Sequence, residues 1–183
     1  SYDAGVIAAR LLTDRLSPTS DILMARIVHS GKNDSNQGKN RRDGFCYYLK
    51  KVGFSGKLHE VELKISDSVY NFAKLNEIFE LNPGIKGAII FNSTCYILGN
   101  YLKTRGMQAV KLVGYDLIER NTQLLSEGVI TALIAQRPER QGYEGIKSLC
   151  NYLLFKQKTE KVNLMPIDIL LRENLKYYLN NKL

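Results

Sequence analysis

Asn92, Asp116 and Gln136 each close an apolar run with the composition of a buried strand, and Arg41 opens a helical segment. Their contexts read AIIFN, VKLVGYD, ITALIAQRP and RRDGF. Together these side chains offer a guanidinium, a carboxylate and two amides, which can donate hydrogen bonds to and accept them from the hydroxyl groups of a neutral ligand. The set contains no nucleophile beside a general base. These residue types therefore favour binding over catalysis.

The elements that must position these residues alternate between strand and helix patterns along the chain. We predict strands over residues 22–28, 58–65, 87–91, 110–114, 129–135 and 164–171. We predict helices over residues 2–16, 40–52, 67–81, 93–104, 118–126 and 138–158, then a short basic tail helix. Expected helix ends are Pro18, Asp67 or Ser66, Ser93 and Gly106. Such alternation is typical of an α/β fold with an open, doubly wound parallel sheet.

In an open parallel sheet the carboxyl ends of the strands share one edge, and ligands bind in the crevice there. We therefore expect the four polar side chains to converge. Taken singly, each has a plainer explanation. Arg41 is a surface residue in the first turn of a helix, Asp116 caps the next helix, Asn92 is a turn residue and Gln136 faces solvent. The sequence leaves these alternatives open.

Composition narrows the class of protein. The chain has 183 residues, 44% hydrophobic and 24% charged, which fits a globular domain. No apolar run reaches the ~18 residues of a membrane helix, and the first residues do not read as a signal peptide. The net charge of +8 comes from scattered basic residues, which favours solvated helix faces over a nucleic-acid surface.

The cysteines and histidines do not form a recognisable site. Cys46, Cys95 and Cys150 lie in apolar helical patterns without CxxC spacing, so we expect buried, reduced thiols in a cytoplasmic protein. Neither His29 nor His59 is near a cysteine in the sequence. We expect no metal, no cofactor and no catalytic activity.

A nucleotide-using enzyme of the Rossmann-like class is the alternative from another class. It would hold a phosphate on the polar loop HSGKNDSNQG, residues 29–38. The loop does not match a dinucleotide fingerprint, and it spaces its Gly and Gly-Lys too widely for a phosphate loop.

Five segments resemble the effector-binding core of the lactose-repressor family and the related ribose-type periplasmic sugar-binding proteins. They are DAGVIAARLL, RRDGF, AIIFNSTCYILG, VKLVGYD and LLSEGVITALIAQRPERQGYEGI, in the family's order and spacing. The resemblance implies that Arg41, Asn92, Asp116 and Gln136 hydrogen-bond a sugar, with Tyr70 or Phe72 as an apolar platform. One departure is Ser93, where the family has Asp.

The resemblance also implies a lobed organisation. Residues 1–136 would form the C-terminal lobe, residues 137–163 a helix returning to an N-terminal lobe that this chain lacks, and residues 164–183 a final strand and tail helix back on the C-terminal lobe. We expect the apolar face of that helix to lie without its sheet.

The family resemblance predicts a sugar-responsive transcription regulator. It would bind a small carbohydrate, form a homodimer without contacting a membrane, and reach operator DNA through a headpiece absent from this chain. A periplasmic sugar-binding protein or a sensor-kinase input domain is the alternative.

Overall fold

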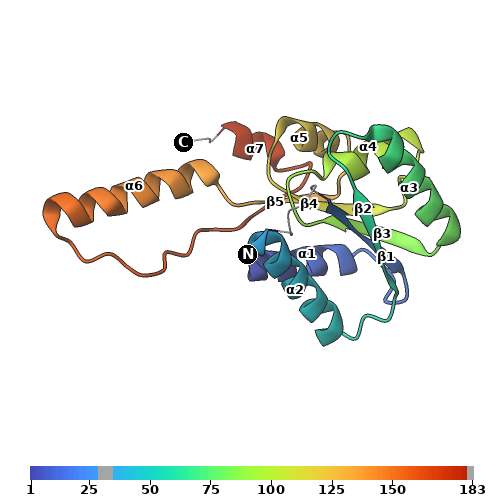
Figure 1. Cartoon of the computed structure of the whole chain (residues 1–183), viewed down its shortest axis with the longest axis horizontal. Coiled ribbons are helices and arrows are strands. Elements are labelled where there is room, and N and C mark those ends of the chain that lie inside the picture. The colour runs from blue at the N-terminus through green and yellow to red at the C-terminus, as the bar shows by residue number, and fades with distance from the viewer. Residues whose placement is uncertain (29–34, 181–183) are drawn as a thin grey trace.

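The computed structural model describes residues 1–28 and 35–180, which form seven helices and six strands (Figure 1). The helices are α1 (Tyr2–Thr13), α2 (Asn36–Lys51), α3 (Ser68–Leu81), α4 (Tyr96–Thr104), α5 (Glu119–Ser126), α6 (Pro138–Phe155) and α7 (Leu175–Asn180). The strands are β1 (Asp21–Ile27), β2 (Leu58–Leu63), β3 (Ile85–Ile90), β4 (Lys111–Tyr115), β5 (Ala132–Ala135) and β6 (Asp168–Leu170). The predicted alternation is confirmed.

The strands form one sheet in the order β2-β1-β3-β4-β5-β6. The first five run parallel, whereas β6 runs antiparallel to β5 and pairs Asp168 with Ala135. Helices α1 and α2 cover one face, and α3, α4 and α5 cover the other (Figure 1). Alternate residues of β1 serve the two faces, since Ile22 packs in the core under α1 and Leu23 in the core on the opposite side. The doubly wound sheet is therefore confirmed, with an antiparallel last strand.

Helix α4 begins later than the sequence predicts. Its first residue is Tyr96, with Cys95 at the N-cap position and no side-chain cap, so the prediction that Ser93 caps this helix is wrong. The reason is tertiary: the side chain of Asn121 on α5 accepts a hydrogen bond from the Tyr96 N–H. By contrast, the predicted Asp67 cap is confirmed, because its carboxylate accepts from the Tyr70 N–H.

Helices α1 and α2 pack backbone against backbone at two glycines. A Cβ atom at Gly5 would lie 1.9 Å from the Arg41 carbonyl oxygen, and one at Gly44 would lie 2.1 Å from the Tyr2 carbonyl oxygen. Only glycine permits this approach. The contact fixes the position of Arg41 relative to the sheet, since α1 also packs on β4.

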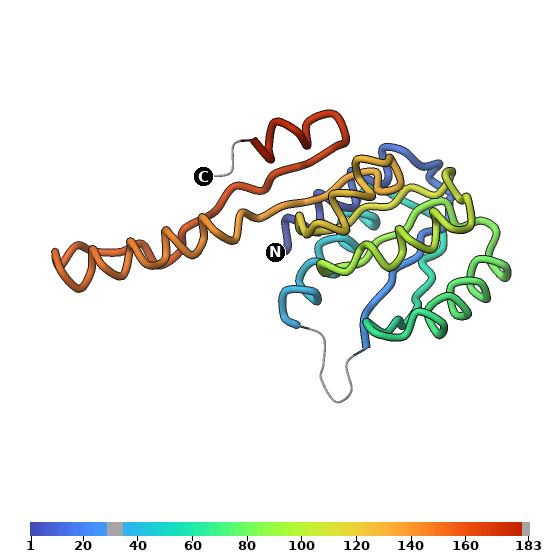
Figure 2. The backbone as a smooth tube through the Cα atoms, turned by 90° about the horizontal axis from the view of Figure 1, so that it is seen from above, coloured from blue at the N-terminus to red at the C-terminus, as the bar shows by residue number. Residues whose placement is uncertain are grey.

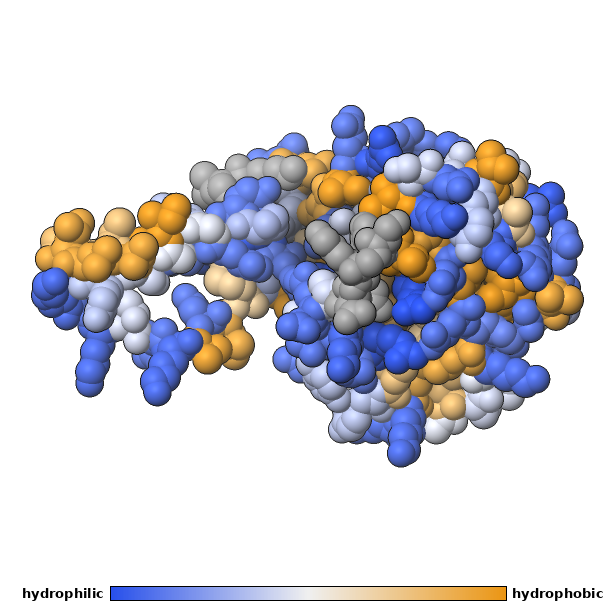
Figure 3. All heavy atoms as spheres, in the orientation of Figure 1, coloured by the Kyte–Doolittle hydropathy of each residue, from blue (hydrophilic) through white to orange (hydrophobic). Residues whose placement is uncertain are grey.

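Helix α6 projects from the lobe as an arm in both views (Figures 1 and 2). None of its residues is buried. Apolar side chains gather along one side of the arm (Figure 3), and Leu149 is 56% exposed although α6 is amphipathic. In the described residues the apolar face of α6 is therefore exposed and not packed on a sheet, as expected.

The same projection corrects one cysteine prediction. Cys150 lies on α6 and is exposed, whereas Cys95 is buried under the sheet and Cys46 is half-buried. In the described residues, no helix is both long and apolar enough to cross a membrane.

Candidate ligand-binding site

Asp116 follows β4 directly and has the left-handed backbone conformation, with φ of 66°. Its N–H donates to the Ile134 carbonyl of β5 at 3.0 Å, which holds the turn against the sheet. Burial raises the pKa of its carboxyl group above the ordinary value, and nearby Arg41 opposes that shift. In the described part of the chain this carboxylate accepts no hydrogen bond. The plain explanation of Asp116 as a helix cap is wrong, because α5 has Ile118 at its N-cap position and no side-chain cap.

Arg41 is buried, with 2% of its surface exposed, so the surface explanation is wrong as well. It also lies beyond the first turn, because α2 begins five residues earlier at Asn36. Its Nη1 donates to the Phe91 carbonyl oxygen at 2.9 Å, and its guanidinium carbon lies 4.1 Å from the centre of the Tyr115 ring. Burial lowers its pKa, and Asp116 opposes that change.

The Arg41 Nε is buried without a hydrogen-bond partner among the described residues. A buried unpaired donor costs about 1–3 kcal/mol. Such a cost on a charged side chain is more typical of a functional site than of a purely structural one.

Asn92 follows β3 and is engaged in its own turn. Its Oδ1 accepts from the Thr94 N–H at 2.9 Å and from the Thr94 hydroxyl at 2.6 Å. The turn explanation is therefore right as far as the oxygen is concerned. Because both lone pairs are used, only the Asn92 amide N–H groups remain for a ligand.

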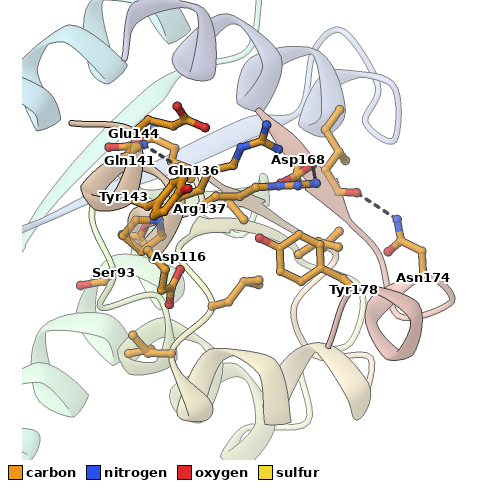
Figure 4. Close-up of a pocket in the computed structure, with 18 of the residues that line it drawn as sticks. Ser93, Asp116, Gln136, Arg137, Gln141, Tyr143, Glu144, Asp168, Asn174 and Tyr178 are labelled. Carbon is orange, nitrogen blue, oxygen red and sulfur yellow. Dashed lines mark hydrogen bonds and ion pairs between the residues drawn. The ribbon is translucent and has the colours of Figure 1, made fainter. Parts of the chain in front are cut away.

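Gln136 follows β5 and closes one side of a hollow of about 1350 Å³ at the carboxyl edge of the sheet (Figure 4). Its Oε1 accepts from Gln37 of α2 at 3.1 Å, and its carbonyl accepts from Gln141 at 2.5 Å. Asp116 and Ser93 line the same hollow. The structure thus brings the Asp116 and Gln136 side chains to one opening, as their strand-end positions predict, but Arg41 and Asn92 are not among the residues that line it.

Tyr70 is not brought to this opening. It lies beside a separate, smaller hollow between β2 and α3, where the Lys64 ammonium stands 4.1 Å from the centre of its ring. The loop proposed for a nucleotide enzyme lies largely outside the described residues, because residues 29–34 are not described. Over residues 1–28 and 35–180 no cluster of potential metal ligands occurs.

Two features at the carboxyl edge of the sheet were not predicted. Arg137 has φ of 46° and pairs with Asp168 of β6 at 2.5 and 3.0 Å, which joins the segment leaving the lobe to the segment returning to it. Asn121 is fully buried and joins two of the loops at the carboxyl edge. Neither has a local sequence signal, since their partners lie 5 to 31 residues away.

The chain was compared with known protein families and structures. A family model described as a periplasmic binding protein domain matches residues 1–157. The chain belongs to this family. A search of curated proteins finds no match to this sequence.

Solved structures agree with this assignment. A protein from Bacteroides fragilis assigned as a LacI transcriptional regulator is 38% identical, with a TM-score of 0.89 over 97% of this chain and 61% of its own. An ABC transporter solute-binding protein from Agrobacterium vitis, bound to α-D-tagatopyranose, is 20% identical, with a TM-score of 0.78 over 95% and 57%. A carbohydrate transporter solute-binding protein from Agrobacterium radiobacter, in complex with D-arabinose, is 20% identical, with a TM-score of 0.78 over 95% of this chain and 60% of its own.

The two transporter proteins show a shared fold only. The chain spans 61%, 57% and 60% of the lengths of these three proteins. The matched proteins are binding proteins and a regulator, and the family is one of ligand-binding domains.

Proposed function

We propose that this chain is the ligand-sensing part of a sugar-responsive transcription regulator, and that it binds rather than converts its ligand. The observation that carries the proposal is the Asp116 carboxylate near the buried Arg41 guanidinium. Burial disfavours the charged form of the Asp116 carboxylate, which lies at the carboxyl edge of the sheet. The Arg41 guanidinium nearby is also buried. Two sugar hydroxyl groups would relieve Asp116 by donating to its oxygens.

The remaining polar groups fit the same ligand. Gln136 would add a donor and an acceptor from the other side of the hollow, and Asn92, which is not among the residues that line the hollow, would donate from its amide nitrogen. The hollow also presents the rings of Tyr143, Tyr177 and Tyr178. Tyr70 remains a prediction without support from its position.

We further propose that residues 1–136 form one lobe and that α6 (Pro138–Phe155) packs on a second lobe in the intact protein. The exposed apolar side chains of α6 support this, since a large uncovered apolar patch is unusual in a soluble domain. Ligand held between two lobes would favour the closed arrangement. A headpiece would then read the change as a difference in DNA affinity between the two states.

The direct test is calorimetry on the full-length protein encoded by the gene, using D-tagatose, D-arabinose and further pentoses and hexoses. For a sugar that binds, Asp116→Ala should weaken binding by about a hundredfold, the worth of two charge-assisted hydrogen bonds. Asp43→Ala, which removes a carboxylate outside the hollow, is the matched control. Unchanged affinity in Asp116→Ala would reject the site.

A regulator is favoured over an exported binding protein by the 38% identity to the Bacteroides fragilis protein. The gene upstream of the Ser1 codon distinguishes the two. A helix-turn-helix segment followed by βα units would support a cytoplasmic homodimeric regulator, because such a headpiece reads DNA bases. A signal peptide in front of the same units would support the alternative, a periplasmic protein or a sensor-kinase input domain.

A further inference from the structure

Asn121 lies in the first turn of α5 and is fully buried. Its Oδ1 accepts from the Tyr96 N–H at 2.9 Å. Its Nδ2 donates to the carbonyl oxygens of Ser93, Tyr115 and Asp116 at 2.9, 3.0 and 3.1 Å. Two N–H groups thus serve three carbonyls, so at least one is shared. Both polar groups of this side chain, the Oδ1 and the Nδ2, are hydrogen-bonded to the backbone.

These bonds join two loops that are distant in sequence. Ser93 lies in the loop between β3 and α4, whose first residue is Tyr96, and Asp116 forms the turn after β4, whose last residue is Tyr115. Both loops reach the candidate hollow, since Ser93 and Asp116 line it. Asn121 therefore lies behind the wall of the hollow and holds its two parts together.

Asp116 is the residue most in need of such support. Its left-handed backbone is unfavourable for a residue with a Cβ atom and persists only where the surroundings enforce it. On one side its N–H is held by the Ile134 carbonyl, and on the other its carbonyl is held by Asn121. The second restraint also fixes Tyr115, whose ring lies under the Arg41 guanidinium.

We infer that Asn121 is a positioning residue, which fixes the Asp116 carboxylate and the Ser93 loop in their binding geometry before any ligand arrives. Only a primary amide suits the task, because the position requires one acceptor for an N–H group and several donors for carbonyl groups. Preorganising a polar site in this way removes an ordering cost from binding. The inference rests on the proposed function for the meaning of Asp116, although the restraint itself belongs to the free chain.

The chain offers a matched control in Asn71. It is 5% exposed, and it too is spent on the backbone: its Oδ1 accepts from the Lys64 N–H at 2.8 Å and its Nδ2 donates to the Lys64 carbonyl at 2.6 Å. It serves the loop between β2 and α3, away from the hollow. The two asparagines thus share chemistry and burial and differ in what they hold.

The experiment is a carbon-13 NMR titration of the Asp116 carboxyl group in this chain without ligand, with the signal assigned by Asp116→Asn. In Asn121→Ser the carboxyl group should gain access to water, and its pKa should fall from the raised value towards that of an ordinary Asp. In Asn71→Ser the pKa of Asp116 should equal that of the wild type, although both variants lower the melting temperature. An unchanged pKa of Asp116 in Asn121→Ser would overturn the inference.

Asn121→Thr, which is closer in volume to Asn, serves if Asn121→Ser does not fold. If neither folds while Asn71→Ser does, Asn121 is a folding residue and the inference is wrong. A second arm measures affinity for a sugar that the wild type binds. There Asn121→Ser should weaken binding about tenfold and Asn71→Ser less than twofold. A lower pKa of Asp116 with no sugar bound by any variant would reject the proposed function and leave the positioning role standing.

Discussion

Two aspartates at opposite edges of the sheet have opposite surroundings. Asp21 opens β1 at the amino edge, where its carboxylate accepts from the Lys57 N–H at 2.9 Å and lies 2.8 Å from the His59 Nε2. The His59 and Lys57 hydrogen bonds lower the pKa of Asp21. Asp116 follows β4 at the carboxyl edge, and burial raises its pKa. The surroundings of Asp21 thus favour its charged form, whereas those of Asp116 disfavour it.

Under the proposed function, this difference separates a charge kept for stability from a charge kept for binding. A side chain kept for stability is surrounded by partners that favour its charged form. A side chain kept for binding is held in a form that a ligand can relieve, at a cost to the free protein. The carboxyl edge shows this cost in two residues, since the buried Arg41 guanidinium also has an unpaired Nε within the described chain.

The largest effect is expected from disturbing the support of the carboxyl edge. Gly5→Ala places a Cβ atom 1.9 Å from the Arg41 carbonyl oxygen, so α1 and α2 must separate. We expect a loss of about 3 kcal/mol in the free energy of unfolding, measured by urea denaturation. Gly145→Ala on α6 is the control. Nothing lies within 4 Å of its Cβ position, and the change should stabilise the helix by up to ~1 kcal/mol. Equal effects would mean that the close contact does not govern this face.

Isosteric neutralisation should affect the two edges with opposite sign. Asp21→Asn weakens two hydrogen bonds to a charged acceptor and should cost about 1 kcal/mol of stability at pH 7. Asp116→Asn removes a penalised charge and should gain roughly 0.5–1 kcal/mol. Thermal denaturation of the two variants beside the wild type checks both signs. Destabilisation by Asp116→Asn would show that its carboxylate has a structural role.

Lowering the pH should abolish the stability effects of both Asp→Asn substitutions, but at different pH values. The pKa of Asp21 is lowered on folding, so its contribution is present above its ordinary pKa and is lost as the pH falls through the folded value. The pKa of Asp116 is raised, so its penalty is present above that raised value and disappears as the pH falls through it. In melting curves from pH 7 to pH 3, the Asp116→Asn advantage should therefore vanish at a higher pH than the Asp21→Asn defect. The reverse order would contradict the assigned surroundings.

Local patterns predict the α/β fold and the strand-end position of Asp116, because the apolar run VKLVGY and the polar residue after it depend only on neighbours in the sequence. They do not predict the start of α4, since its first N–H is satisfied by Asn121, which lies 25 residues further along the chain. They misplace Cys150 for a related reason. Its helix has the amphipathic pattern of a covered helix, and the described chain supplies no cover.

The smallest expected effect concerns this uncovered helix, which leaves the sheet at the carboxyl edge directly after Gln136. Leu149 is 56% exposed, so Leu149→Ala should change the free energy of unfolding of this chain by less than ~0.5 kcal/mol. In the full-length protein the same substitution should cost about 2 kcal/mol, as in a packed core, if a second lobe covers α6. Lys147→Ala, on the same helix, should change stability little in both proteins. A negligible effect of Leu149→Ala in both proteins would contradict the proposal that a second lobe covers α6. The carboxyl edge of the sheet would then have no second lobe to close over its ligand.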